Sequence, residues 1–161
     1  MKKLGFSVGV AALTAALVSG ALALAEGPTR SEYVGRLEKI CKPSAEATTR
    51  AMEGVRDDLR NHRLDAAAAK FEAARQIFHS TVATMSAVSR PSEDRDTLSE
   101  WFGYLKRQET YLRKIAEALR AGKAIKAQHL TTAFIRSGNR ANDVTLAFGF
   151  NYCRFKFSRY S

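Results

Sequence analysis

Histidines are the residues of this chain most able to bind a metal, and the sequence contains three of them, His62, His79 and His129. A di-iron site in a helical bundle uses Glu-x-x-His repeats, but no glutamate stands three residues before any of these histidines. The motifs of covalent haem attachment (Cys-x-x-Cys-His) and of zinc sites (Cys-x-x-Cys, His-x-x-x-His) are also missing from the sequence. We therefore expect neither a metal nor another cofactor, and we place the three histidines on helix surfaces or in loops.

Nucleophilic catalysis would need a serine or cysteine held beside a base and an orienting group. The chain has no Gly-x-Ser-x-Gly elbow, and its two cysteines, Cys41 and Cys153, are better explained as a disulfide. Several carboxylates have lysine or arginine close by in the sequence, which is typical of solvated ion pairs on helices rather than of an acid/base pair. These carboxylates are Glu72, Glu100, Glu109 and Glu117. The sequence thus predicts that the protein is not an enzyme.

Basic residues dominate the charge of the chain, because 26 lysines and arginines face 16 acidic residues and give a formal net charge of +10. They concentrate in the segment 106–126 and near the C-terminus. An excess of this kind suits anionic surfaces such as cell-wall polymers or lipid head groups. The candidate contacts for such a surface are Lys106, Arg107, Arg113, Lys114, Arg120, Lys123, Arg154, Lys156 and Arg159, with Lys126, Arg136 and Arg140 in the same half of the chain.

The C-terminal segment "RFKFSRY" alternates basic and aromatic residues, a combination that also suits stacking on nucleic acid bases. A simpler interpretation is that the basic residues solvate helix faces while Phe155 and Phe157 cover one end of the folded domain. We favour this simpler interpretation, so nucleic acid is the less favoured partner. The sequence gives no indication of the oligomeric state.

The first 25 residues have the layout of a secretory signal peptide. A pair of lysines precedes the uncharged run Leu4–Leu24, and the tripeptide Ala-Leu-Ala ending at Ala25 places small residues at both positions that a signal peptidase reads. An uncleaved anchor is the alternative, since about 20 apolar residues can span a bilayer. Gly20 and the small residues favour cleavage after Ala25, which would remove two lysines from the net +10 and leave +8. We expect an extracytoplasmic protein, secreted or associated with the cell envelope, in which cysteines oxidise.

Apolar residues then recur at steps of three or four in four segments, which predicts four helices. The first segment opens with Thr29 and Glu32, the pattern of a capping box, and its apolar stripe continues to Leu59. Pro43 lies inside this stripe and is expected to bend the helix beside Cys41, because proline cannot donate to the carbonyl four residues earlier.

The other three segments are equally periodic. The second spans residues 64–88 and stops at Pro91, and the fourth spans residues 127–148 and stops at Gly149. The third segment has a leucine at every seventh position, and these leucines are Leu98, Leu105, Leu112 and Leu119. Stripes of this kind in one short chain predict an all-α protein, an up-and-down four-helix bundle in which residues 26–161 form a single domain.

The bundle topology also predicts a disulfide. In an up-and-down bundle the fourth helix ends beside the start of the first, which carries Cys41 in its first third. Cys153 lies four residues beyond Gly149, so the chain can turn back across that end. We predict a Cys41–Cys153 disulfide that ties the first helix to the C-terminal segment. Closing a loop of roughly 100 residues stabilises a fold by about 4–5 kcal/mol in the chain-entropy view.

Two motifs resemble a known group of sequences. "SEYVGRLEKIC" (residues 31–41) and "RANDVTLAFGFNYC" (residues 140–153) are similar to the two ends of small exported helical proteins of high-GC Gram-positive bacteria. That group shows a Tyr-Val-x-x-x-Glu-x-Ile-Cys opening and a Gly-Phe-x-x-Cys close, and it is functionally uncharacterised. The region around Trp101 and the turn "LRAGKAIKA" are similar too, so the resemblance spans most of the predicted mature chain. The present chain departs from the group by continuing past its last cysteine.

The sequence therefore points to an exported, non-enzymatic helical module that binds or supports structures at the cell envelope. The alternative is a small-ligand or haem-type binder that uses a cavity between the helices. We place that cavity around Trp101, Phe71 and Phe78, the large aromatic residues on the predicted inner faces of the second and third helices.

Overall fold

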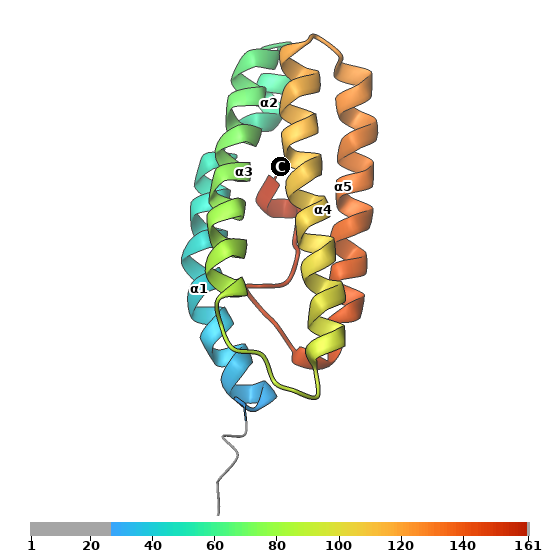
Figure 1. Cartoon of the computed structure of the whole chain (residues 1–161). Coiled ribbons are helices and arrows are strands. Elements are labelled where there is room, and N and C mark those ends of the chain that lie inside the picture. Colours follow the sequence, from blue (N-terminus) through green and yellow to red (C-terminus); the bar gives the residue numbers. More distant parts are fainter. Residues whose placement is uncertain (1–26, 161) are drawn as a thin grey trace, which may run out of the picture.

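The computed structural model describes residues 27–160, and the segment predicted to be a signal peptide lies outside them. In the described part, every regular element is a helix (Figure 1). The elements are α1 (Arg30–Ala51), α2 (Val55–Arg60), α3 (Leu64–Ser86), α4 (Arg95–Arg120), α5 (Ala124–Val144) and the 3₁₀ helices η1 (Leu146–Phe148) and η2 (Phe157–Tyr160). The predicted all-α fold is confirmed, and none of the described helices is long and apolar enough to cross a membrane.

Helix α1 begins as its sequence predicts. The Thr29 hydroxyl accepts a hydrogen bond from the backbone N–H of Glu32, and the Glu32 carboxylate accepts one from the backbone N–H of Thr29, so the capping box is confirmed. The helix continues on both sides of Pro43, which lies exposed on its surface. Its buried face carries Leu37 and Cys41, as predicted, and also Tyr33, which is completely buried.

The prediction that the first helix runs on to Leu59 is wrong. Gly54 adopts a left-handed conformation with φ of 72°, which interrupts the helical path between the end of α1 at Ala51 and the start of the short helix α2 at Val55. Glycine tolerates this conformation because it has no Cβ to clash with the backbone. The apolar period passes through the break, since Met52 and Val55 are both buried, but Leu59 is 37% exposed.

Helices α3 and α4 form an antiparallel pair along the centre of the molecule (Figure 1). The leucines at heptad spacing in α4, Leu98, Leu105, Leu112 and Leu119, are all buried, as the sequence predicts. The connection between the two helices is tied down by Asp94, whose buried carboxylate accepts hydrogen bonds of 2.8 and 2.6 Å from the guanidinium of Arg30 on α1.

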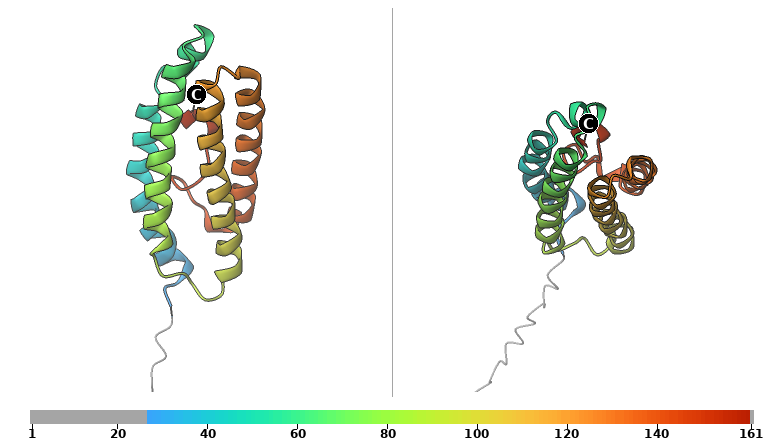
Figure 2. Two further views of the ribbon diagram at one scale, coloured as in Figure 1. Left: turned by 45° about the horizontal axis from the view of Figure 1, so that its top comes forward. Right: turned by 90° about the horizontal axis from the view of Figure 1, so that it is seen from above.

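The bundle is not closed by helix packing alone. Helix α1 packs on α3, α3 on α4, and α4 on α5, whereas the main neighbours of α1 on its other side are η1 and η2. The view from above shows the C-terminal segment between the α1–α3 pair and the α4–α5 pair (Figure 2). In a fully closed four-helix bundle, α1 would pack against α5. Here the chain turns back after α5, and this C-terminal segment (residues 145–160) fills the seam between α1 and α5.

Gly138 of α5 makes room for this returning segment. A Cβ atom at this position would overlap the ring of Phe155, because the ring lies directly against the helix backbone. The ring of Phe155 contacts that of Phe134 edge to face, with 5.2 Å between centroids, and Phe134 makes a second such contact with Tyr160. The expectation that Phe155 and Phe157 cover an end of the domain is therefore wrong for Phe155, whose ring packs against the side of α5, whereas Phe157 lines a cavity beside α2.

The core has two parts that meet at Phe78. The part nearer α2 gathers residues of α3, α4 and α5 around Phe134 and Tyr160. The other part is built around Trp101, whose ring is stacked on that of Phe150 at 5.1 Å between centroids. Each part includes residues that follow α5, so the C-terminal segment is an integral piece of the core.

Candidate functional site

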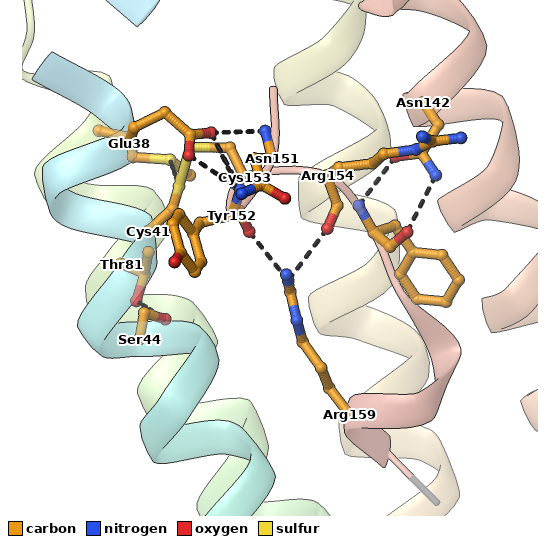
Figure 3. Close-up of a disulfide and its surroundings, with 12 residues drawn as sticks. Glu38, Cys41, Ser44, Thr81, Asn142, Asn151, Tyr152, Cys153, Arg154 and Arg159 are labelled. Atoms are coloured by element: carbon orange, nitrogen blue, oxygen red, sulfur yellow. Dashed lines mark hydrogen bonds between the residues drawn. A yellow bond between two sulfur atoms is a disulfide. The ribbon is translucent and has the colours of Figure 1, made fainter. Parts of the chain in front are cut away.

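The predicted disulfide is present between Cys41 of α1 and Cys153 of the returning segment (Figure 3). The S–S distance is 2.09 Å, the Cα–Cα distance is 5.0 Å, and the bond closes a separation of 112 residues. No free cysteine remains in the described part of the chain. Since both thiols are consumed, neither is available there as a nucleophile.

Glu38 lies one turn before Cys41 and binds the same segment. Its carboxylate accepts hydrogen bonds from three successive backbone N–H groups, those of Asn151, Tyr152 and Cys153, at distances from 2.9 to 3.2 Å (Figure 3). These N–H groups lie in irregular chain and have no helix or sheet partner. The carboxylate therefore satisfies a stretch of backbone that would otherwise rely on water.

A second clamp follows on the α5 side. The Asn142 side chain donates to the carbonyl oxygen of Phe155 at 3.0 Å and accepts from the N–H of the same residue at 2.8 Å (Figure 3). The guanidinium of Arg159 donates to the carbonyl oxygens of Tyr152 and Arg154, and its burial lowers the pKa of this arginine from its ordinary value. Glu38, Asn142 and the two cysteines, which all lie within the two sequence motifs, thus hold the C-terminal segment in place.

A basic groove of about 220 Å³ lies elsewhere, on the surface between α4 and α5. We call it the arginine groove. It is lined by Tyr104, Arg107 and Tyr111 of α4 and by Ala133, Arg136, Ser137 and Arg140 of α5. Arg136 and Arg140 are four residues apart, so they share one face of α5. The groove therefore gathers three guanidinium groups and two phenol rings from adjacent helices.

The arginines of this groove carry uncompensated charge. None of the three forms a salt bridge with a carboxylate of the described residues, whereas Arg113, also on α4, pairs with Glu117 at 2.6 Å. The guanidinium of Arg107 lies over the ring of Tyr104, 4.1 Å from its centroid, which restricts its conformation.

Ser137 also lines the groove, but its hydroxyl oxygen is buried rather than exposed in it. The residue is only 7% exposed, and its hydroxyl has no hydrogen-bond partner within the described part of the chain. By contrast, the hydroxyls of Thr131 and Thr132 on the same helix bond to the carbonyls four residues earlier. An unpaired buried hydroxyl is costly unless a water or a ligand supplies its partner.

The basic residues that the sequence analysis proposed as contacts for an anionic surface do not gather at one site in the structure. Lys106, Arg107, Arg113, Lys114 and Arg120 are exposed along α4, and Lys123 is exposed just before α5. Arg154 and Lys156 are exposed on the returning segment, while Arg159 is partly buried and holds backbone. Arg107 alone among these nine lines the arginine groove. Tyr104, Tyr111 and Ser137 were missed, because only the side-by-side packing of α4 and α5 brings them to Arg136 and Arg140.

The structure also separates the aromatic residues around which a ligand cavity was expected. Trp101 and Phe78 line a void of about 50 Å³ next to the disulfide. Phe71 lines a larger cavity, of about 360 Å³, at the end of the bundle where α2 lies. Two distinct spaces thus replace the single cavity of the sequence-based hypothesis.

The histidines do not converge on a metal-binding arrangement, and across residues 27–160 no group of three or more His, Cys, Asp or Glu side chains could hold a metal ion. Nδ1 of His79 lies 2.8 Å from the Glu109 carboxylate, as a surface pair between α3 and α4. His62 lies at the turn before α3 and His129 is exposed on α5.

Comparisons of the chain with protein-family models, with curated proteins and with solved structures found no match. Fold and site alone therefore define the class: an all-helical bundle whose open seam is filled by a disulfide-linked C-terminal segment, with a groove of unpaired arginines on one face.

Proposed function

We propose that this chain is an exported, non-enzymatic helical module that binds an anionic polymer of the cell envelope through the arginine groove. The observation that carries the proposal is the convergence of Arg107, Arg136 and Arg140, none of them ion-paired within residues 27–160, on one groove. Guanidinium groups bind phosphate and carboxylate oxygens through paired hydrogen bonds, and the phenol hydroxyls of the two tyrosines are further possible donors.

Export is the part of the proposal that rests on the sequence. The first 25 residues have the three regions of a signal peptide. A disulfide between Cys41 and Cys153 is the expected state of cysteines in an oxidising compartment. Both observations support a location outside the cytoplasm, where anionic polymers of the envelope are accessible to the groove.

A polymer suits the groove better than a lipid surface does. The arginines line a hollow between two helices, into which one oxyanion of a flexible chain can enter. A bilayer presents its charges on a flat surface and is better matched by exposed side chains that extend outward. Exposed lysines such as Lys114, Lys123 and Lys126 would serve a membrane equally well, which provides a way to separate the two partners.

The test uses disulfide-bonded protein recovered from a host that exports it, with polyphosphate and polygalacturonate as probes. Changing Arg107, Arg136 and Arg140 together to glutamine should weaken polymer binding at least tenfold without changing helicity. Binding by the unaltered protein should fall steeply between about 50 and 200 mM salt, since charges are screened within roughly 8 Å at physiological ionic strength.

The matched control changes Lys114, Lys123 and Lys126 to glutamine, which removes the same number of charges from exposed positions outside the groove. This variant should retain most of the polymer binding. Equal loss in both variants would show that diffuse charge drives binding, and the groove would lose its role. Binding to phosphatidylglycerol vesicles but to neither polymer would assign the partner to the membrane instead.

A further inference from the structure

The cavity of about 360 Å³ opens between α2, α3, α4, α5 and η2, and its inner wall is apolar. Val55, Phe71, Ile115 and Leu119 line it, and each is at most 4% exposed. Phe157 and Tyr160 of the C-terminal segment complete the wall. The size and lining match those of small-molecule sites, which are concave, mostly apolar and about 300–1,000 Å³ in volume.

The mouth of the cavity is polar and carries positive charge. Arg56, His62 and Gln128 line it and are exposed, and no aspartate or glutamate is among the described residues that line it. The two acids of α2 are already neutralised, because Asp57 pairs with Arg60, and the buried Asp58 pairs with Arg63 and Lys70. A ligand at this mouth would therefore meet a free guanidinium and no opposing carboxylate.

Two further observations indicate what kind of molecule the cavity suits. Leu59 lies in the lining with 37% of its surface exposed, one of three large hydrophobic residues exposed in the described part of the chain. Tyr160 lines the same cavity and is only 7% exposed, so it is part of the buried wall of the cavity. A bound molecule with an apolar part would cover Leu59 and pack against this wall.

We infer that this cavity binds a single-chain amphiphile with an anionic head group, of which a medium-chain fatty acid is the simplest representative. The acyl chain lies against Phe71, Ile115 and Leu119, where the hydrophobic effect favours burial of each methylene. The carboxylate stays at the mouth, where Arg56 supplies a charge-assisted hydrogen bond. This site is separate from the arginine groove and does not depend on it.

The experiment titrates the disulfide-bonded protein with decanoate below its micellar concentration and follows both the Tm and the complex in native mass spectrometry. A specific site gives one bound decanoate per chain and raises the Tm by about 5–10 °C at a hundred times the Kd. Decanol should bind at least tenfold more weakly, because it lacks the charge that Arg56 recognises. Equal binding of decanol would contradict the proposed preference for an anionic head group. Absence of binding by both compounds would contradict the proposal that the cavity is an amphiphile site.

Two pairs of variants locate the site. Ala124→Trp places a large ring at the mouth, where Ala124 is exposed, and should abolish the Tm shift; Ala147→Trp changes another exposed alanine, outside the cavity, and should preserve it. Arg56→Glu should weaken decanoate binding at least tenfold while Arg50→Glu, on the exposed surface of α1, should not. A shift that survives Ala124→Trp would place the decanoate elsewhere and refute the proposal.

Haem is the competing occupant, because His62 at the mouth could coordinate iron. Haemin binding with a Soret shift that disappears in His62→Ala, without any response to decanoate, would overturn the fatty-acid assignment. None of these outcomes changes polymer binding by the arginine groove, so each proposal can fail without the other.

Discussion

The carboxylate of Glu38 accepts a hydrogen bond from the backbone N–H of Cys153, whose sulfur is bonded to Cys41 one helical turn further along α1. A covalent bond and a charged acceptor on the same helix therefore hold the same stretch of irregular chain. The disulfide restricts how far the segment can move away, and the carboxylate orients the N–H groups of Asn151, Tyr152 and Cys153. Together they direct the chain into the seam between α1 and α5.

Replacing Glu38 with alanine should lower the free energy of unfolding by about 2 kcal/mol, in the range expected for hydrogen bonds to a charged group. Glu46→Ala is the matched control, because Glu46 is exposed on the same helix and the intrinsic helix propensity changes equally. Chemical denaturation of both variants measures the difference. Equal stability of the two would show that the Glu38 carboxylate contributes nothing beyond solvation.

Thiol counting on denatured, unreduced protein should find no free cysteine, because Cys41 and Cys153 are bonded. Cys41→Ser and Cys153→Ser should each lower stability by about 4–5 kcal/mol, as chain entropy requires for a loop of roughly 100 residues. The double variant should be no less stable than either single one, since all three lack the same bond. Unequal effects of the two single changes would indicate a role for one sulfur outside the disulfide.

Two helical glycines should respond in opposite directions to alanine. An added Cβ at Gly35 of α1 would meet no atom within 4 Å, so Gly35→Ala should stabilise the protein by about 0.5–1 kcal/mol. Gly138→Ala would force Phe155 from its place and should cost about 1–3 kcal/mol. Thermal or chemical unfolding measures both. If the cost at Gly138 persists in a Phe155→Ala background, the clash with that ring is not its cause.

Alkaline pH should destabilise the protein through two buried tyrosines. Burial raises the pKa of Tyr33 and of Tyr160 from 10.0 to about 12. The folded chain therefore holds these protons more tightly than the unfolded chain. The resulting contribution to stability is fully present below pH 10 and is lost as the pH rises towards 12.

Unfolding by denaturant at a series of pH values, with tyrosinate absorbance as a second readout, measures this loss. The double variant Tyr33→Phe, Tyr160→Phe should show a smaller decline over the same window. Loss of the Tyr33 hydroxyl should change the stability of this variant little at neutral pH, because that buried hydroxyl has no hydrogen-bond partner in residues 27–160. A decline that is unchanged in the double variant would assign the alkaline transition to other groups.

The sequence by itself predicted the disulfide and the helices apart from the break between α1 and α2. Leu98, Leu105, Leu112 and Leu119 follow a seven-residue period that only a helix can bury on one face, and all four are buried in α4. Thr29 and Glu32 likewise define a local start, since a capping box involves residues only three apart. With two cysteines in the chain, the pairing followed once the up-and-down topology brought them together.

The helix break and the contacts between distant segments depend on the tertiary structure, because the apolar periodicity does not indicate them. The stripe of α1 continues through Val55, so the break at Gly54 depends on one backbone angle rather than on the apolar pattern. Glu38 accepts from an N–H 113 residues away, and Gly138 matters only because Phe155 returns to it. Arg107 meets Arg136 and Arg140 only where α4 packs beside α5. Local sequence determines local hydrogen bonds and burial, whereas contacts between distant segments depend on the path that the whole chain takes through space.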